Sequence, residues 1–209
     1  MNSNSTEILK RLKKHYPEAK IALNYSSPIE ILVATILSAQ CTDKQVNKVT
    51  EAIFKKYKSA KDYASADIKE FEQEIKSTGF YHNKAKNIVE SAKIIVTKHG
   101  RKVPDTMNNL LTLPGVARKT ANIVLGNAYN IVEGIPVDTH VKRLSQRLGL
   151  SNESNPEKIE QDLMHLFKKK QWYKLSYLLI EHGRNTCNAK KPLCDKCFLK
   201  DICPKKDYK

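Results

Sequence analysis

The chain has 209 residues, and 37 Lys and Arg against 22 Asp and Glu give a net charge of +15. A hydrophobic content of 40% and a charged content of 28% exclude a disordered or fibrous chain. No apolar stretch reaches the roughly 20 residues that cross a bilayer, and Met1 to Lys20 has no apolar segment of a secretion signal, so we expect a cytoplasmic protein without membrane attachment. The positive charge favours a polyanion such as nucleic acid, and the alternative is a lysine-rich surface that serves only solubility.

Helical periodicity dominates and strand-like alternation is nearly absent, which predicts an all-α fold. The first clear helix start is Ser27-Pro28-Ile29-Glu30, with Ser as N-cap, Pro in the first turn and Glu closing a capping box. The apolar residues from there to Leu37 predict a buried central helix, beside which Cys41 is expected to be an inert core thiol. Further helices are predicted at 43–57, 67–77, 84–98, 106–112, 118–129, 139–148, 156–169 and 172–182.

A tight turn, Leu113-Pro114-Gly115-Val116-Ala117, lies between two predicted helices. The proline fixes φ and ends the first helix, and the glycine permits the positive φ that a sharp reversal needs. The backbone N–H groups of Val116, Ala117 and Arg118 are then expected to be unpaired donors at a helix start, which is an arrangement that binds phosphate. An ordinary αα-hairpin without a ligand produces the same pattern.

Two residues near helix starts have both a structural and a catalytic interpretation. Lys119 is expected in the first turn of a helix, where an ammonium group opposes the macrodipole. It is either an activated amine nucleophile or a surface lysine that reaches a phosphate. Asp138, in Val137-Asp138-Thr139-His140, is a good N-cap, and its second oxygen remains available for electrostatic work in a pocket. His140 is expected to be structural.

Four of the five cysteines lie in the C-terminal tail with the spacing C-x6-C-x2-C-x5-C. This spacing predicts a tetrahedral metal or cluster site built on one loop, and both zinc and a four-iron cluster accept four thiolates. Lys190 and Lys191 lie between the first two cysteines, so a metal that orders the loop would fix two cations in place. The four cysteines are Cys187, Cys194, Cys197 and Cys203.

Together these motifs resemble the endonuclease III family of helix–hairpin–helix DNA glycosylase/AP lyases, from about Ile21 to Cys203. The cysteine spacing is the one that this family uses for a [4Fe–4S] cluster. The other matches are Leu113 to Ala121 with the family's hairpin, Val137 to His140 with its catalytic aspartate motif, and Leu37-Ser38-Ala39-Gln40 with Thr42-Asp43 of its early helix.

The resemblance implies two helical domains, one with the helix–hairpin–helix and one with the four-cysteine iron–sulfur loop. Residues 22–131 would form a helical barrel that holds the hairpin at about 106–129. Residues 1–21 and 132–209 would form the second domain, with the cluster loop at 187–203. The chain departs from the family at Ala117, where the usual hairpin has a second glycine and where a Cβ would crowd a phosphate if this residue needed a positive φ.

The resemblance also implies an activity. Lys119 would be the nucleophile and Asp138 the essential carboxylate of an enzyme that removes oxidised pyrimidines from duplex DNA through a Schiff base. It would then cut 3′ to the abasic site by β-elimination. Its partner would be double-stranded DNA with damaged bases or abasic sites, and it would be a monomer, at the nucleoid if the source is bacterial.

The implied DNA contacts come from three parts of the chain. Gln40 would fill the gap left by an extruded base, Phe80 would act as a wedge, and the cluster loop would contribute two lysines. The complete set is Gln40, Phe80, Gly115, Val116, Ala117, Arg118, Lys190 and Lys191.

Two alternatives remain. A monofunctional adenine glycosylase resembles this family in fold and cluster but lacks lysine at the position of Lys119. A non-catalytic helix–hairpin–helix module would bind DNA through the hairpin and the basic tail alone. Lys119 favours the bifunctional lyase.

Overall fold

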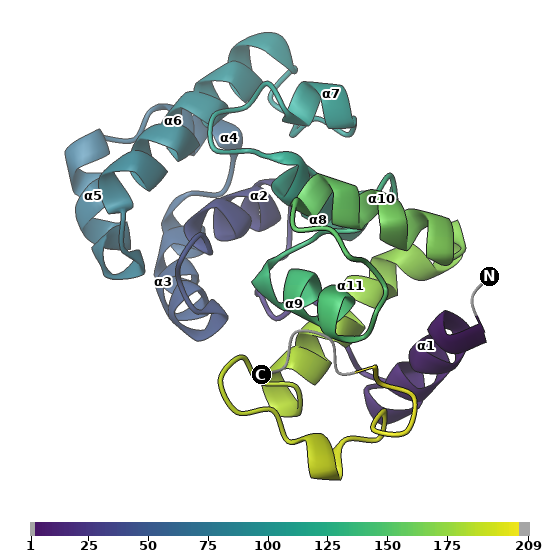
Figure 1. Cartoon of the computed structure of the whole chain (residues 1–209). Helices are drawn as coiled ribbons and strands as arrows, with labels where there is room; N and C mark the ends of the chain where they lie inside the picture. Colours follow the sequence, from purple (N-terminus) through teal and green to yellow (C-terminus); the bar gives the residue numbers. More distant parts are fainter. Residues whose placement is uncertain (1–2, 205–209) are drawn as a thin grey trace. The chain divides into compact units, whose positions relative to one another are not determined.

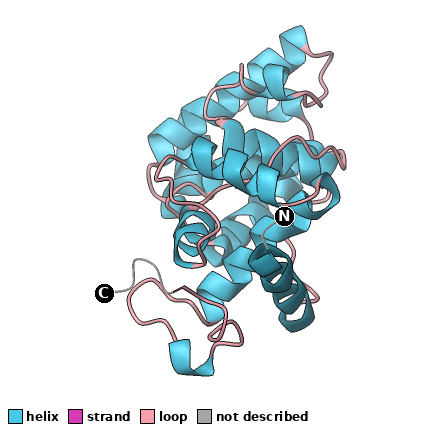
Figure 2. Cartoon of the chain, turned by 45° about the vertical axis from the view of Figure 1, so that its right-hand side comes forward, coloured by secondary structure: helices cyan, strands magenta, loops and turns pink. Residues whose placement is uncertain are grey.

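A computed structural model describes residues 3–204, and every regular element within that range is a helix (Figure 1, Figure 2). The prediction of an all-α fold is therefore confirmed. None of these helices is both long enough and apolar enough to cross a membrane. The chain folds into two compact units, one of Ala22–Glu133 and one that joins Met1–Ile21 to Gly134–Lys209.

The unit of residues 22–133 is built around two helix pairs, α2 against α8 and α4 against α6. Its buried apolar side chains come from every one of its longer helices and include the stacked rings of Tyr57 and Tyr63. The bounds are α2 (Pro28–Leu37), α3 (Asp43–Lys56), α4 (Ala60–Ala64), α5 (Ile68–Ile75), the 3₁₀ helix η1 (Lys76–Thr78), α6 (Tyr81–Lys98), α7 (Met107–Leu110) and α8 (Arg118–Ala128).

Helix α2 is buried along nearly its whole length, as its apolar sequence predicts. The Ser27 side chain caps it by accepting the Glu30 N–H, and Pro28 occupies the first turn. The predicted capping box is only half formed. The Glu30 carboxylate does not return to Ser27. It accepts hydrogen bonds from the backbone N–H (2.6 Å) and the hydroxyl (2.8 Å) of Ser26, which offers two donors to one carboxylate oxygen.

The second unit has one core formed by α1, α9, α10, α11 and the C-terminal tail. Ile8, Leu144, Leu178 and Leu199 are completely buried in it. The Arg11 guanidinium of α1 donates to the Phe198 carbonyl, so the first helix and the tail are joined by polar as well as apolar contacts. The bounds are α1 (Ser3–His15), α9 (Thr139–Arg147), α10 (Pro156–Leu166), α11 (Lys169–Asn185) and the 3₁₀ helix η2 (Cys194–Lys196).

Several boundaries differ from the sequence prediction, and three of the differences have a clear local cause. Helix α4 was not predicted, because it has only five residues and depends on a capping box between Ser59 and Asp62. The predicted helix at 67–77 changes to a 3₁₀ turn after Ile75. The predicted helix at 156–169 ends at Leu166, because Phe167 is extended and α11 begins two residues later.

Candidate functional site

The hairpin between α7 and α8 is anchored on α6. Gly115 has a φ of +77°, as the sharp reversal predicts. A Cβ at this glycine would lie 2.8 Å from Nδ2 of Asn87, so the position also needs the absence of a side chain. The Ser91 hydroxyl donates to the Pro114 carbonyl at 2.9 Å, which fixes the turn from the same helix.

The amides of the hairpin differ in part from the prediction. The Val116 N–H donates to the Leu113 carbonyl at 3.1 Å, and the Val116 side chain is buried. The expectation that this amide is an unpaired donor is therefore wrong, because the turn closes on its own carbonyl. The first hydrogen bond of α8 runs from the Ala121 N–H to the Ala117 carbonyl. Arg118 lies in the first turn of α8, where backbone N–H groups have no acceptor within the helix.

Ala117, where the related hairpins have glycine, is the N-cap of α8. Its φ of −91° and ψ of 172° are extended backbone, which any residue adopts without strain. The expected crowding by its Cβ depended on a positive φ, and this condition is not met. Lys119 is the second residue of α8, and its side chain is half-buried.

Asp138 is the N-cap of α9, as one of its two interpretations predicts. Its Oδ1 accepts the Val141 N–H at 2.8 Å, which fixes the carboxylate at the positive end of this helix. The Asp138 side chain is half-buried. The His140 ring packs closely against Gly183 of α11. A Cβ added at Gly183 would lie only 2.8 Å from Nδ1 of His140.

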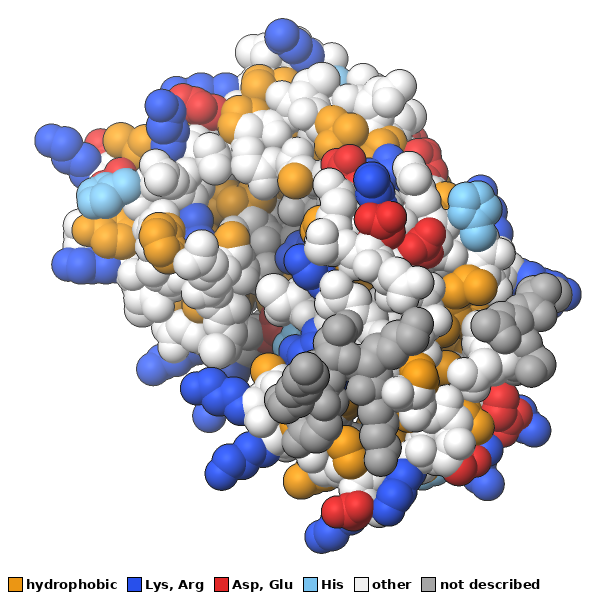
Figure 3. All heavy atoms as spheres, in the orientation of Figure 1, with side chains coloured by type: hydrophobic (Ala, Val, Ile, Leu, Met, Phe, Trp, Pro, Cys, Tyr) orange, Lys and Arg blue, Asp and Glu red, His pale blue; other side chains and the backbone are white. Residues whose placement is uncertain are grey.

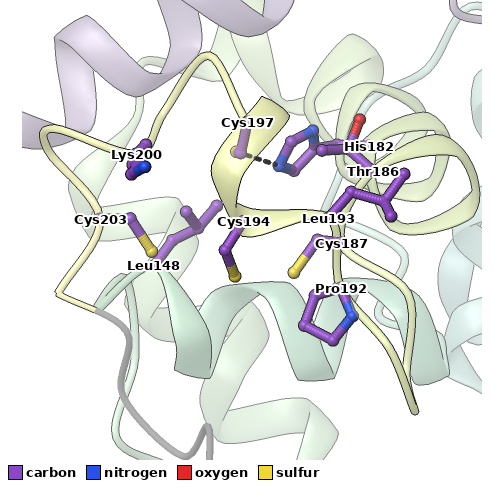
Figure 4. Close-up of a pocket in the computed structure, with 10 residues that line it drawn as sticks. All are labelled: Leu148, His182, Thr186, Cys187, Pro192, Leu193, Cys194, Cys197, Lys200 and Cys203. Atoms are coloured by element: carbon purple, nitrogen blue, oxygen red, sulfur yellow. Dashed lines mark hydrogen bonds between the residues drawn. The ribbon is translucent and has the colours of Figure 1, made fainter.

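The four cysteines of the tail line one pocket together with Leu148, His182 and Leu193 (Figure 4). Figure 4 shows the sulfur of Cys197 facing His182, whose Nε2 is 3.6 Å away. Within residues 3–204, no three or more His, Cys, Asp or Glu side chains form a ready site for a single metal ion.

The surroundings of the sulfur atoms fit an anionic cluster. An Arg147 N–H lies 3.5 Å from Sγ of Cys187, and the Leu199 amide donates to Sγ of Cys197 at 3.4 Å. Burial raises the pKa of Cys197, and the other three thiols raise it further. A thiolate at Cys197 is therefore unfavourable unless a cationic metal centre binds it.

The four-cysteine loop is held to α9 by arginine. Arg147 donates to the carbonyls of Asn188 (2.8 Å) and Ala189 (2.9 Å), directly before Lys190 and Lys191. Both lysine side chains are exposed. Figure 3 shows many Lys and Arg side chains and fewer acidic ones on the visible face, as the composition requires.

Two of the predicted DNA contacts share a hollow with the hairpin glycine. Gln40, Phe80 and Gly115 line one pocket, although they come from three separate segments. The same pocket is lined by Lys84, a residue that the sequence did not single out. Cys41, next to Gln40 in the chain, is half-exposed, so the prediction of a core thiol is wrong: the residue lies in the turn after α2 rather than on its buried side.

Comparison with known proteins identifies the family. Residues 33–169 match the family described as HhH-GPD superfamily base excision DNA repair protein. The chain belongs to this family. The resemblance drawn from the sequence is thereby confirmed.

Three similar proteins illustrate the relationship. Endonuclease III of Synechocystis sp. is 54% identical over 200 residues, which cover 96% of this chain and 91% of that protein. A non-covalent endonuclease III–DNA complex has a TM-score of 0.93 at 38% identity, covering 98% of this chain and 97% of the other. A trapped endonuclease III–DNA covalent intermediate has a TM-score of 0.92 with the same identity and coverage.

Proposed function

We propose that this protein is a base-excision DNA glycosylase with AP lyase activity that acts on duplex DNA containing damaged bases or abasic sites. The observation that carries the proposal is a lysine, Lys119, in the first turn after the hairpin of a chain 54% identical to an endonuclease III. A similar protein of known structure was trapped as a covalent intermediate with DNA. An amine is the group that forms such a bond with the C1′ carbon of a sugar.

The reaction begins with extrusion of the damaged nucleotide, because its C1′ atom is buried in the base stack. The lone pair of the Lys119 amine forms a bond to C1′ as the glycosidic bond breaks, and the proton that the attacking nitrogen loses leaves with the base. The sugar ring opens to give an imine with the lysine. Removal of a C2′ proton then breaks the C3′–O bond and releases the 3′ phosphate, so that the strand is cut.

Asp138 supplies negative charge to this reaction. One of its oxygens is held by the Val141 amide. The carboxylate stabilises the positive charge that develops on the sugar as the base departs, and it assists proton transfer. The amides at the start of α8, at Ala117 and Arg118, bind a phosphate of the damaged strand.

Oxidised pyrimidines are the substrates that we propose. A monofunctional adenine glycosylase needs no amine nucleophile, and a binding module needs neither Lys119 nor Asp138. A panel of duplexes that each carry thymine glycol, dihydrouracil, an abasic site or adenine opposite 8-oxoguanine separates the three activities. The adenine enzyme releases base without a nick, and the binding module does neither.

The test of the chemistry is borohydride trapping with a duplex that contains an abasic site. We expect a covalent adduct with the wild-type chain and none with Lys119→Ala, whereas Lys86→Ala, a change at an exposed lysine of α6, keeps the adduct. Asp138→Asn retains an N-cap but removes the charge, so base release should slow by about 10²-fold or more. An undiminished adduct in Lys119→Ala would remove this lysine from the mechanism.

We further propose that Cys187, Cys194, Cys197 and Cys203 hold a [4Fe–4S] cluster, which supplies a fixed core around which the loop folds. Arg147 and the Leu199 amide donate toward the thiolates, and the ordered loop presents Lys190 and Lys191 to the DNA backbone. We place the enzyme in the cytoplasm, as a monomer.

The metal content tests this proposal. The purified protein should be brown, with about four iron atoms and four inorganic sulfides per chain. Cys194→Ser should lower the iron content. A colourless protein with one zinc ion per chain would contradict the cluster.

A further inference from the structure

Lys84, on α6, is buried in a way that is rare for lysine. Only 4% of its surface is exposed. Its ammonium group donates two hydrogen bonds of 2.8 Å, one to the Leu37 carbonyl and one to the Thr78 carbonyl. Burial lowers the pKa of Lys84, so the site bears an electrostatic cost that the two carbonyls offset.

Both acceptors are the last residues of helices. Leu37 ends α2 and Thr78 ends η1, and the final carbonyls of a helix lack partners within it and carry partial negative charge. One ammonium group therefore joins two helix ends that lie far apart in the sequence. It is fixed at the points where two surface loops begin.

Each loop contains a non-glycine residue in the left-handed region. Gln40, three residues after Leu37, has a φ of +53°, and Phe80, two residues after Thr78, has a φ of +50°. Such a conformation costs about 1–2 kcal/mol per residue and persists only where the surrounding structure enforces it. Both side chains are exposed, and Phe80 has 63% of its surface in solvent, so neither conformation is explained by burial of its own side chain.

The two strained residues lie at one place. Gln40 and Phe80 line the same hollow as Gly115 of the hairpin, and Lys84 forms part of its wall. The lysine thus shares a hollow with the two side chains that the family resemblance assigns to the interior of the duplex. Its two hydrogen bonds fix where each loop leaves its helix.

We propose that Lys84 is a positioning residue for the recognition of damaged duplex DNA. It holds the Gln40 loop and the Phe80 loop in fixed relation, so that both side chains enter the gap left by an extruded nucleotide together. The inference rests on the proposed function, but it concerns the binding of duplex DNA and not the chemistry of Lys119. The abasic deoxyribose alone, in a single strand, does not require the two side chains.

The test compares Lys84→Met with Lys86→Met. The first variant keeps a buried apolar stem and removes the donors, and the second makes the same change at an exposed lysine of the same helix. For each, the Kd is measured for a duplex with a tetrahydrofuran abasic-site analogue and for the same duplex undamaged. Borohydride trapping is measured on single-stranded abasic DNA.

We expect Lys84→Met to lower the preference for the analogue duplex about tenfold, which corresponds to about 1.4 kcal/mol, with single-strand trapping within about twofold of wild type. Lys86→Met should match wild type in every measurement. A Lys84→Met variant that loses thermal stability but keeps the wild-type preference for the analogue would overturn the inference, since the lysine would then be only structural.

A second variant covers the case in which Lys84→Met does not fold. Lys84→Arg retains a charged donor with a different shape, and it should show a smaller loss of the same preference; an unchanged preference also contradicts the inference. Failure of the proposed lyase activity can be told apart from failure of the proposed role of Lys84. A wild-type chain that prefers the analogue duplex but forms no adduct refutes the lyase, while the Kd ratios still decide the role of Lys84.

Discussion

Two segments of the chain enter a helix in the same way and serve different purposes. Gly79 and Gly115 have φ values of +70° and +77°, and α6 and α8 begin two and three residues after them. Each glycine precedes, at the same spacing, an alanine that is completely buried. The unit of residues 22–133 therefore contains two similar helix starts.

The segments differ in the residue directly after the glycine. Phe80 is left-handed and projects into solvent, whereas Val116 is buried and its amide closes the turn. The first segment therefore exposes a side chain, and the second exposes the backbone at the start of α8. A wedge at Phe80 and a phosphate site at the start of α8, as we propose, would require these two kinds of exposure.

The lysines of the two segments differ by one position. When the two segments are aligned on Gly79 and Gly115, Lys84 matches Thr120, and both are buried. In the same alignment Lys119 matches the exposed Asn83. One residue turns a side chain by about 100° around a helix, which is enough to move it from the interior to the surface. The lysine is thereby a buried anchor in α6, whereas the lysine of α8 is only half-buried.

The largest expected effect of this difference is on stability. Lys84→Ala should lower the free energy of unfolding by about 2–4 kcal/mol, because it removes a buried stem and leaves two buried carbonyls without a donor. Lys119→Ala should change it by about 0.5 kcal/mol or less. Urea denaturation measures both. Equal losses in the two variants would contradict the contrast between the buried and the half-buried lysine.

The features that the sequence predicted well depend on short segments. The cap of α2 at Ser27, the positive φ of Gly115 and the N-cap at Asp138 each depend on residues within one turn. The four cysteines, whose spacing within one loop predicts a shared site, line one pocket.

Of the features that were missed, one depends on contacts between distant segments and the other on a local turn. Lys84 is buried because the ends of α2 and η1 meet beside it, and no local pattern distinguishes it from the exposed Lys86. The free amide expected at Val116 was lost to a carbonyl only three residues away, which the spacing of the turn residues did not reveal.

A smaller effect distinguishes the two glycines. Alanine at either one should destabilise the chain by about 1–3 kcal/mol, because both have a positive φ. Only at Gly115 would the new Cβ also meet a neighbour, at 2.8 Å from Nδ2 of Asn87; nothing lies within 4 Å of a Cβ at Gly79. Asn87→Ala should therefore recover about 0.5–1 kcal/mol in the Gly115→Ala background and none in the Gly79→Ala background. Urea denaturation of the single and double variants measures the coupling, and strictly additive losses at Gly115 and Asn87 would show that backbone conformation alone selects glycine in the hairpin.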